Sequence, residues 1–374
     1  MTDSAASKNM GRELKIGNLI AKIPVVQGGM GVGISLSKLA GAVAKAGGIG
    51  IISTAQIGFK KDSYDKDPHG SNIEAIGEYI SEAKELAEGG IVGVNIMVAT
   101  TGYEEYVKAA VAAGADIVVS GAGLPLNLPE LVENSDTKIA PIVSSKKAAM
   151  VIIKQWQRHY NRFPDMIVIE GPFAGGHLGF SKEDIDSYIE ETKFYEDGNS
   201  VNRTISANYD AEIKQILDYI DEVCKENNVH IPVVVGGGVF DRSDADHYMG
   251  LGADGVQIAT RFVATHECDA DEKYKLAYIN ASKEDVVIVK SPVGMPGRAI
   301  KNAFLERVKS GERIMGKCRQ CVKTCNPATT PYCISQALIN AAIGKVDEGL
   351  IFCGGNVEKI KNIVSVASIM AEFA

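Results

Sequence analysis

Short apolar runs and helical patterns alternate along most of the chain. Eight of these runs are continuous and rich in β-branched residues, which is typical of strands buried on both faces. The segments between them repeat apolar residues at helical spacing, as Leu36, Leu39 and Val43 do. In chain order, the eight runs are IPVVQGG, IGIIST, GIVGVNIMV, ADIVVSGAG, TKIAPIVSS, DMIVIEG, IPVVVGGGV and ADGVQIATRF.

Eight strand-then-helix units in 374 residues predict an α/β fold, a (β/α)8 TIM barrel, with a doubly wound sheet as the competing fold. Glycine-rich turns follow many of the strands and none fits G-x-G-x-x-G, because Asp241 stands where Gly236-x-Gly238 needs its third glycine. This favours the barrel. The expected organisation is a barrel over residues 1–310 with an insertion at about 181–208 after the sixth strand, and a cysteine-containing lid and helical segment over 311–374 packed on the barrel.

Charge and composition narrow the classes of binding partner and the compartment. The chain carries 47 Asp and Glu against 39 Lys and Arg, a formal net charge of −8, and shows no basic block. This argues against nucleic acid or an acidic membrane surface as a partner. The polar amino end lacks the apolar core of a secretory signal, and no 18-residue apolar run follows. The seven cysteines are therefore expected as thiols or ligands in a reducing cytoplasm.

In a barrel, the chemistry lies at the carboxyl ends of the strands, where polar and glycine-rich segments would rim one mouth. Three consecutive glycines after the seventh run expose backbone N–H groups just before a helix that begins near Asp241 or Arg242. Loops at this place in a barrel bind phosphate, although the glycines could instead serve a tight turn alone. The residues that follow the strands are Gln27 to Gly33, Asn95, Gly121 to Gly123, Lys146 or Lys147, His177, Gly236 to Gly238, and Gln257 to Arg261.

His177 follows the sixth run, which ends in Glu170, and four glycines flank it: Gly171, Gly175, Gly176 and Gly179. A lone histidine is more often a structural group packed among side chains. The glycines here leave few neighbouring side chains, so we expect a functional imidazole with a near-neutral pKa.

Four cysteines near the carboxyl end have the spacing C-x2-C-x3-C-x7-C: Cys318, Cys321, Cys325 and Cys333. Four close thiols could bind zinc or an iron–sulfur cluster, but this spacing matches neither the paired zinc knuckles nor a ferredoxin run. We therefore expect reduced thiols in a lid over the barrel mouth, without a metal. Cys353 is expected to line the same region.

Six segments in this order resemble the nitronate monooxygenase (2-nitropropane dioxygenase-like) family: PVVQGGMG, GVNIM, FAGGHLG, VVVGGGV, GVQIATRF and PGRAIKNAF. That family also contains the flavin-dependent enoyl-acyl-carrier-protein reductases. The resemblance extends from about Ile23 to Phe304, and GLIFCGGN resembles a late family segment. Each motif alone is weak, whereas the combination is highly specific. The resemblance implies a TIM barrel that holds FMN, in agreement with the alternation of strands and helices.

The resemblance also implies roles for individual residues. A cation near the N1–C2 carbonyl region of the flavin would stabilise its anionic reduced form, which gives Lys146 or Lys147 a function. The alternative is a solvated helix start. The FMN phosphate would lie on Gly236, Gly237, Gly238, Ala259 and Thr260; Gln257 and Asn95 would reach the ring or ribityl chain; Gly28, Gly29 and Met30 would lie along the isoalloxazine, with Gly175 and Gly176 also near the cofactor.

By this resemblance the chain is an FMN-dependent oxidoreductase. Its first expected reaction is the oxidation of alkyl nitronates by dioxygen. His177 would take a proton from the carbon beside a nitro group or present positive charge to the nitronate. The alternative is an NAD(P)H-dependent enoyl-thioester reductase, and a third is a flavin protein for interaction or quinone-type reduction. The sequence shows no basic groove of the kind that would bind a phosphopantetheine thioester. Arg298 and Lys301 are the nearest candidates for a site that binds the phosphate of a nicotinamide cofactor. The expected partners are small molecules, with a homodimer allowed for.

Overall fold

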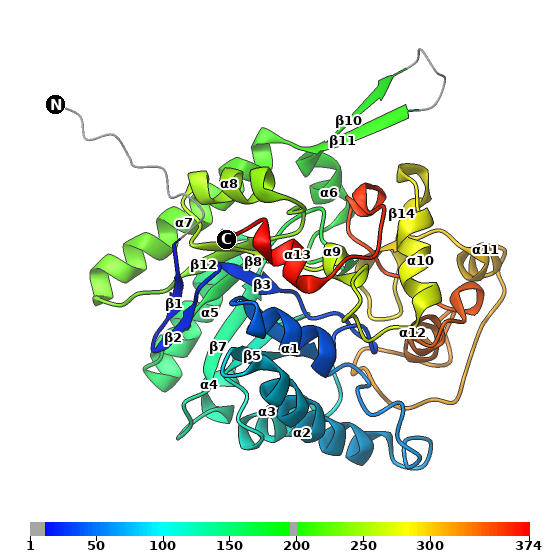
Figure 1. The fold of residues 1–374 in the computed structure, drawn as a ribbon, viewed down its shortest axis with the longest axis horizontal. Coiled ribbons are helices and arrows are strands. Elements are labelled where there is room, and N and C mark those ends of the chain that lie inside the picture. Colours follow the sequence, from blue (N-terminus) through cyan, green and yellow to red (C-terminus); the bar gives the residue numbers. More distant parts are fainter. Residues whose placement is uncertain (1–11, 195–199) are drawn as a thin grey trace.

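Eight parallel strands close into a barrel in the computed structural model, which describes residues 12–194 and 200–374 (Figure 1). The last barrel strand pairs with the first, for example Val256 with Val25, so the sheet has no free edge. The predicted TIM barrel is confirmed and the doubly wound alternative is wrong. The barrel strands are β3 (Val25–Gln27), β4 (Ile49–Ser53), β5 (Ile91–Met97), β6 (Ile117–Gly121), β7 (Lys138–Val143), β8 (Ile167–Glu170), β12 (Val233–Gly236) and β13 (Gly255–Ile258).

In most of the strands, successive apolar residues enter two different apolar clusters. Ile51 lies with Val119 in a cluster inside the barrel, whereas the next residue, Ile52, packs with the surrounding helices. This alternation explains why the strands read as continuous apolar runs. Leu14 and Ile16 join the inner cluster. They belong to an unpredicted hairpin, β1 (Leu14–Ile16) and β2 (Leu19–Ala21), which closes the amino end of the barrel.

Helices cover the barrel and start at recognisable caps. The Asp67 side chain accepts from the Gly70 N–H at the start of α2, and Ser145 accepts from the Ala148 N–H at the start of α5. The covering helices are α1 (Ser37–Lys45), α2 (Pro68–Ala87), α3 (Tyr103–Ala112), α4 (Leu128–Leu131), α5 (Lys146–Tyr160), α7 (Ala207–Asn227), α8 (Arg242–Leu251) and α9 (Thr260–Val263).

The expected insertion after the sixth barrel strand forms α6 (Lys182–Tyr188) and an antiparallel hairpin, β10 (Ile189–Phe194) with β11 (Ser200–Ile205). The hairpin projects away from the barrel (Figure 1). Residues 195–199 of the expected insertion lie outside the described residues.

Segments after the last barrel strand pack over the carboxyl ends of the strands. Antiparallel strands β14 (Val286–Lys290) and β15 (Pro296–Ile300) form a small sheet with β9 (Gly176–His177). The chain end returns to the barrel, where α13 packs against α1. The division at residue 310 stays a prediction. The remaining elements are α10 (Glu272–Asn280), η1 (Lys283–Asp285), α11 (Ala303–Lys309), α12 (Ile334–Ala342), η2 (Val346–Glu348), η3 (Val357–Lys359) and α13 (Val366–Ala371).

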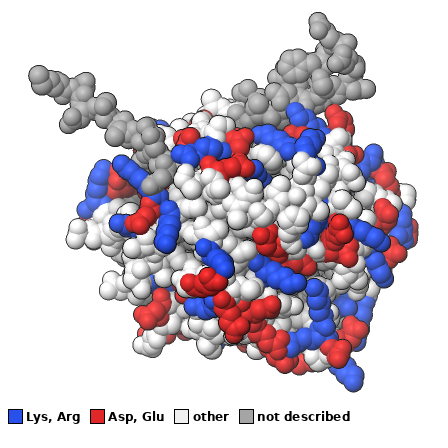
Figure 2. Space-filling model, in the orientation of Figure 1, with Lys and Arg blue, Asp and Glu red and all other residues white. Residues whose placement is uncertain are grey.

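Acidic and basic side chains are interspersed over the face in Figure 2, which shows no broad basic patch. Among the described residues, the helices are all too short or too polar to cross a membrane.

Candidate active site

A cavity of about 420 Å³ lies at the carboxyl ends of the barrel strands. Each of the eight strands, or the turn after it, contributes to its wall, as the barrel rule leads one to expect. The structure brings most of the sequence-predicted residues together here. Those that line the cavity are Gly28, Gly29, Met30, Asn95, Gly175, Gly176, His177, Gly236, Gly237, Gly238, Gln257, Ala259 and Thr260.

Lys146 is not among the lining residues. It is the first residue of α5, its backbone N–H donates to Glu212 (3.0 Å), and its ammonium lies 5.9 Å from the Tyr219 ring centre. Both partners belong to α7 in the outer helical layer. Neither Lys146 nor its neighbour Lys147 lines the cavity. The predicted flavin contact from this position is therefore unsupported, because a lysine at the start of a covering helix is directed along the outside of the barrel.

Glycine is required in the turn after β12. Gly237 and Gly238 have φ angles of +82° and +137°, which side chains rarely adopt. A Cβ at Gly237 would lie 2.6 Å from the Gly171 carbonyl oxygen, in the turn after the neighbouring strand. Close packing of two strand-end turns therefore needs these glycines. The backbone N–H groups of Gly237, Gly238 and Thr260 donate to no described residue, so they remain available to an anion.

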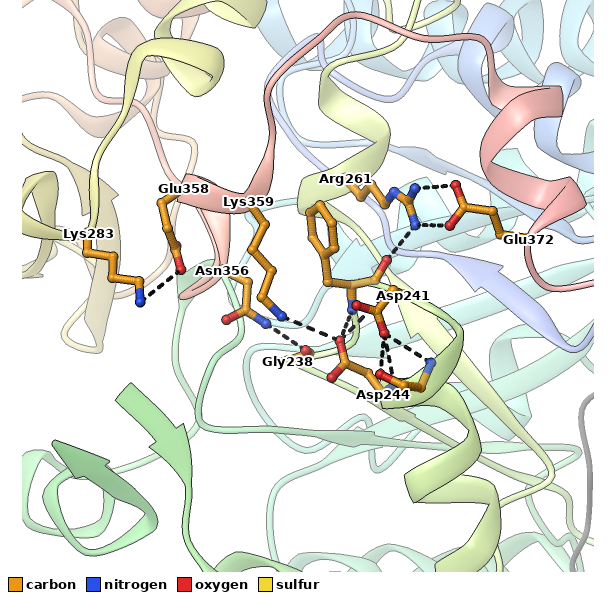
Figure 3. Close-up of polar contacts among 11 residues, drawn as sticks. Gly238, Asp241, Asp244, Arg261, Lys283, Asn356, Glu358, Lys359 and Glu372 are labelled. Atoms are coloured by element: carbon orange, nitrogen blue, oxygen red, sulfur yellow. Dashed lines mark hydrogen bonds and ion pairs between the residues drawn. The ribbon is translucent and has the colours of Figure 1, made fainter. Parts of the chain in front are cut away.

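The amino end of α8 offers no second anion site, since Asp241 caps it with its own carboxylate. That carboxylate accepts from the Ser243 and Asp244 N–H groups, at 3.0 and 3.2 Å. Arg261, predicted beside the phosphate loop, instead pairs with Glu372 and donates to the Phe240 carbonyl oxygen at 2.8 Å (Figure 3).

A segment near the carboxyl end of the chain, residues 354–359, covers the glycine turn and is called the strap below. The Asn356 side-chain amide donates to the Gly238 carbonyl oxygen at 2.8 Å (Figure 3), and the Gly354 N–H donates to the Thr260 hydroxyl at 2.9 Å. Lys359 lies 3.9 Å from Asp244. The strap thus fixes the turns after β12 and β13 from outside.

His177 lies on β9 and also lines the cavity. Its Nε2 atom is 2.7 Å from the Ser291 hydroxyl oxygen, and its ring packs edge-on against Phe352, with ring centres 5.0 Å apart. Burial lowers the pKa of His177 to about 4, because the charged imidazolium would lose its hydration. The near-neutral pKa expected from the sequence is wrong. The imidazole is neutral at physiological pH, and its neighbours come from distant segments rather than from the flanking glycines.

Glu170 is a cavity residue to which the sequence analysis gave no role. It ends β8, lines the cavity, and accepts the Gly179 N–H at 2.8 Å. Burial raises its pKa to about 7, against the opposing effects of that hydrogen bond and of Arg298. A carboxylate that ends an otherwise apolar strand, directly before the histidine loop, was the signal that could have identified it. The Ser144 hydroxyl, just after β7, donates to the Gly179 carbonyl oxygen at 2.8 Å. Gly179, at the end of the histidine loop, is therefore held by the carboxyl ends of both β7 and β8.

The family model described as nitronate monooxygenase matches residues 12–374. This chain belongs to the nitronate monooxygenase family. The family assignment makes it a flavin-dependent oxidoreductase and confirms the resemblance seen in the motifs.

Individual relatives are distant. A probable nitronate monooxygenase of Staphylococcus saprophyticus is 24% identical over 315 residues, covering 78% of this chain and 79% of that protein. A Mycobacterium tuberculosis protein named (3aS,4S,5R,7aS)-5-hydroxy-7a-methyl-1-oxo-octahydro-1H-indene-4-carboxyl-CoA dehydrogenase is 23% identical, covering 78% and 67%.

Two solved structures share the fold. FabK from Thermotoga maritima superposes with a TM-score of 0.66 at 24% identity, covering 94% of this chain and 92% of that one. A nitroalkane oxidase from Streptomyces ansochromogenes gives 0.67 at 18% identity, covering 94% of each. At these identities the likeness supports the barrel fold alone.

In the described part of the chain, the cysteines of this nitronate monooxygenase family member form no disulfide bond. Cys353 lines the cavity, and burial raises its pKa to about 12, so it stays protonated. The Ser335 hydroxyl donates to Cys321 Sγ at 2.9 Å. In the described part of the chain, no three His, Cys, Asp or Glu side chains are placed to hold a metal ion. Absence of a metal from the four-cysteine segment stays a prediction.

Proposed function

We propose that this chain is an FMN-dependent nitronate monooxygenase that oxidises small alkyl nitronates with dioxygen. The observation that carries this proposal is the neutral imidazole of His177 in the cavity at the strand ends, which a turn of uncommitted backbone N–H groups also lines. The family match supplies the reaction class, oxidation–reduction on a flavin.

The residues present fit a flavin mononucleotide. The free N–H groups of Gly237, Gly238 and Thr260 would hold its single phosphate, as glycine turns after the last barrel strands do elsewhere. Gly29 has no room for a side chain, since a Cβ would overlap Asn95, and this lets the ring approach the backbone. Gln257 and Asn95 would hydrogen-bond the cofactor. When bound, the flavin accepts electrons from the substrate and passes them to dioxygen.

His177 would act on the substrate carbon. As a neutral base it can take the proton from the carbon beside a nitro group: the C–H bond breaks, its electron pair remains on the nitronate, and an N–H bond forms on the ring. The nitronate formed beside it offsets the cost of a buried imidazolium. The other expected role, a standing positive charge that orients the anion, does not suit a group with a pKa of about 4.

The groups nearest to a possible nicotinamide phosphate site are engaged elsewhere. Arg298 is buried, donates to the Ala174 carbonyl oxygen, and lies over the Phe173 ring. Lys301 lies 3.5 Å from Glu306 at the surface. This favours the carbon substrate over NAD(P)H as the electron donor.

Anaerobic mixing distinguishes the candidate reactions. We expect the purified protein to release FMN rather than FAD on denaturation, an alkyl nitronate to bleach the flavin rapidly, and NADH and NADPH to bleach it poorly. The second candidate, an NAD(P)H-dependent enoyl-thioester reductase, is favoured by the relative named as a CoA-thioester dehydrogenase. Rapid bleaching by NAD(P)H, with none by nitronate, would replace the first function by the second.

A further inference from the structure

A second, smaller cavity of about 190 Å³ lies directly beside His177 and is called the side chamber below. Five of its lining residues also line the main cavity, so the two spaces meet at the imidazole. The shared residues are Met97, Ala122, Gly123, His177 and Met295. The residues that line the side chamber alone are Ala99, Val293, Val322 and Thr324.

The cysteine segment builds one wall of the side chamber and is fixed in place. Val322 forms an antiparallel bridge with Thr100, and the Lys323 N–H donates to the Ala99 carbonyl oxygen at 2.9 Å. The Thr324 hydroxyl donates to the Val293 carbonyl oxygen at 3.2 Å, which ties this wall to the β14–β15 turn. The wall is therefore tied to both neighbouring segments by hydrogen bonds.

The lining is apolar apart from His177 and Thr324, and the Thr324 hydroxyl is already hydrogen-bonded. The lining contains no lysine, arginine, aspartate or glutamate. Two methionines, Met97 and Met295, border the junction and can adapt to ligands of different shape. Such a space suits a hydrocarbon group. A methylene group is about the size of a water molecule, about 30 Å³, so the side chamber holds roughly six methylene groups.

We propose that the side chamber binds the alkyl chain of the substrate and places its reacting carbon at His177. The proposal rests on the proposed function and specifies its substrate class as linear nitronates of about four to seven carbons. Val322 and Val293 line the chamber from two different segments of the chain. Thr324 is exposed, so longer chains extend past it into solvent.

A chain-length series tests the side chamber. We expect kcat/KM for linear nitronates of two to ten carbons to rise roughly fourfold per methylene and to level off near six or seven carbons. Val322→Trp should abolish this rise. Ala328→Trp is the matched control, because it adds the same bulk to an exposed position of the same segment and should leave the series unchanged.

Binding measurements separate this inference from the proposed reaction. Calorimetry with linear 1-nitroalkanes should show dissociation constants that fall with chain length in the parent and not in Val322→Trp. Val293→Trp fills the chamber from the β14–β15 turn and serves if Val322→Trp fails to fold, as judged by circular dichroism and flavin content. Binding of this kind without nitronate turnover would remove the proposed function and keep the chamber. A chain-length series that is flat in the parent, or unchanged by both tryptophans, would overturn the chamber.

Discussion

The glycine turn at one part of the cavity and the surroundings of His177 at another are built in different ways. The turn follows directly from its strand, and local packing against Gly171 explains its glycines. His177 instead contacts Ser291, which lies 114 residues further along the chain, and Phe352, which lies further still. The comparison teaches that the proposed cofactor site is a property of the barrel. The environment of the reactive histidine is a property of the segments that follow it.

The largest effect should come from removing the imidazole. His177→Ala is expected to keep the flavin, since the turns after β12 and β13 would hold it, and to lower kcat with a neutral 1-nitroalkane by about 10²–10⁴-fold, as loss of a general base does. Steady-state kinetics and the flavin spectrum measure the two properties. His247→Ala is the control, because that histidine pairs with Asp210 on the outer helices. Turnover within a few-fold of the parent would make His177 structural.

Gly237→Ala should affect the cofactor site rather than the imidazole. A Cβ there would lie 2.6 Å from the Gly171 carbonyl oxygen, at a φ of +82°. We expect weaker FMN binding and a loss of about 1–3 kcal/mol in the free energy of unfolding. Gly250→Ala in α8 meets nothing within 4 Å and should be neutral or slightly stabilising. Calorimetric unfolding and FMN titration compare them; equal behaviour of the two variants would contradict a strained turn.

The difference between the two regions also sets what the sequence could predict. Continuous apolar runs and glycines at strand ends are local signals, so the barrel and the shared cavity followed from them. The neutral imidazole did not, because its pKa depends on burial beside β15, Ser291 and Phe352, which no local pattern brings to His177. Lys146 shows the same limit: its place after a strand suggested the barrel mouth, whereas in the structure its ammonium lies by Tyr219 of α7.

Glu170 should make turnover depend on pH. Its pKa of about 7 means that it is neutral below that value and charged above it, whereas His177, at about 4, stays neutral throughout. The negative charge on ionised Glu170 disfavours the binding of an anionic nitronate in the same cavity. We therefore expect kcat/KM for a preformed nitronate to fall up to about tenfold between pH 6 and pH 8. In Glu170→Gln the profile should be flat over this range; a fall that persists in the variant would assign it to another group.

Ser291→Ala should have the smallest effect. It tests the hydrogen bond between His177 and a residue that is distant in the sequence. The serine hydroxyl lies 2.7 Å from Nε2, so its loss frees the ring to turn and leaves one buried nitrogen without this partner. A hydrogen bond of this kind contributes about 1 kcal/mol, which corresponds to a roughly fivefold fall in kcat. Because the turn after β12 is untouched, FMN affinity should not change. Ser310→Ala, which removes a hydroxyl bonded to the Arg307 carbonyl oxygen at the surface, is the control. A loss of FMN affinity in Ser291→Ala, with kcat unchanged, would show that the two regions are not independent.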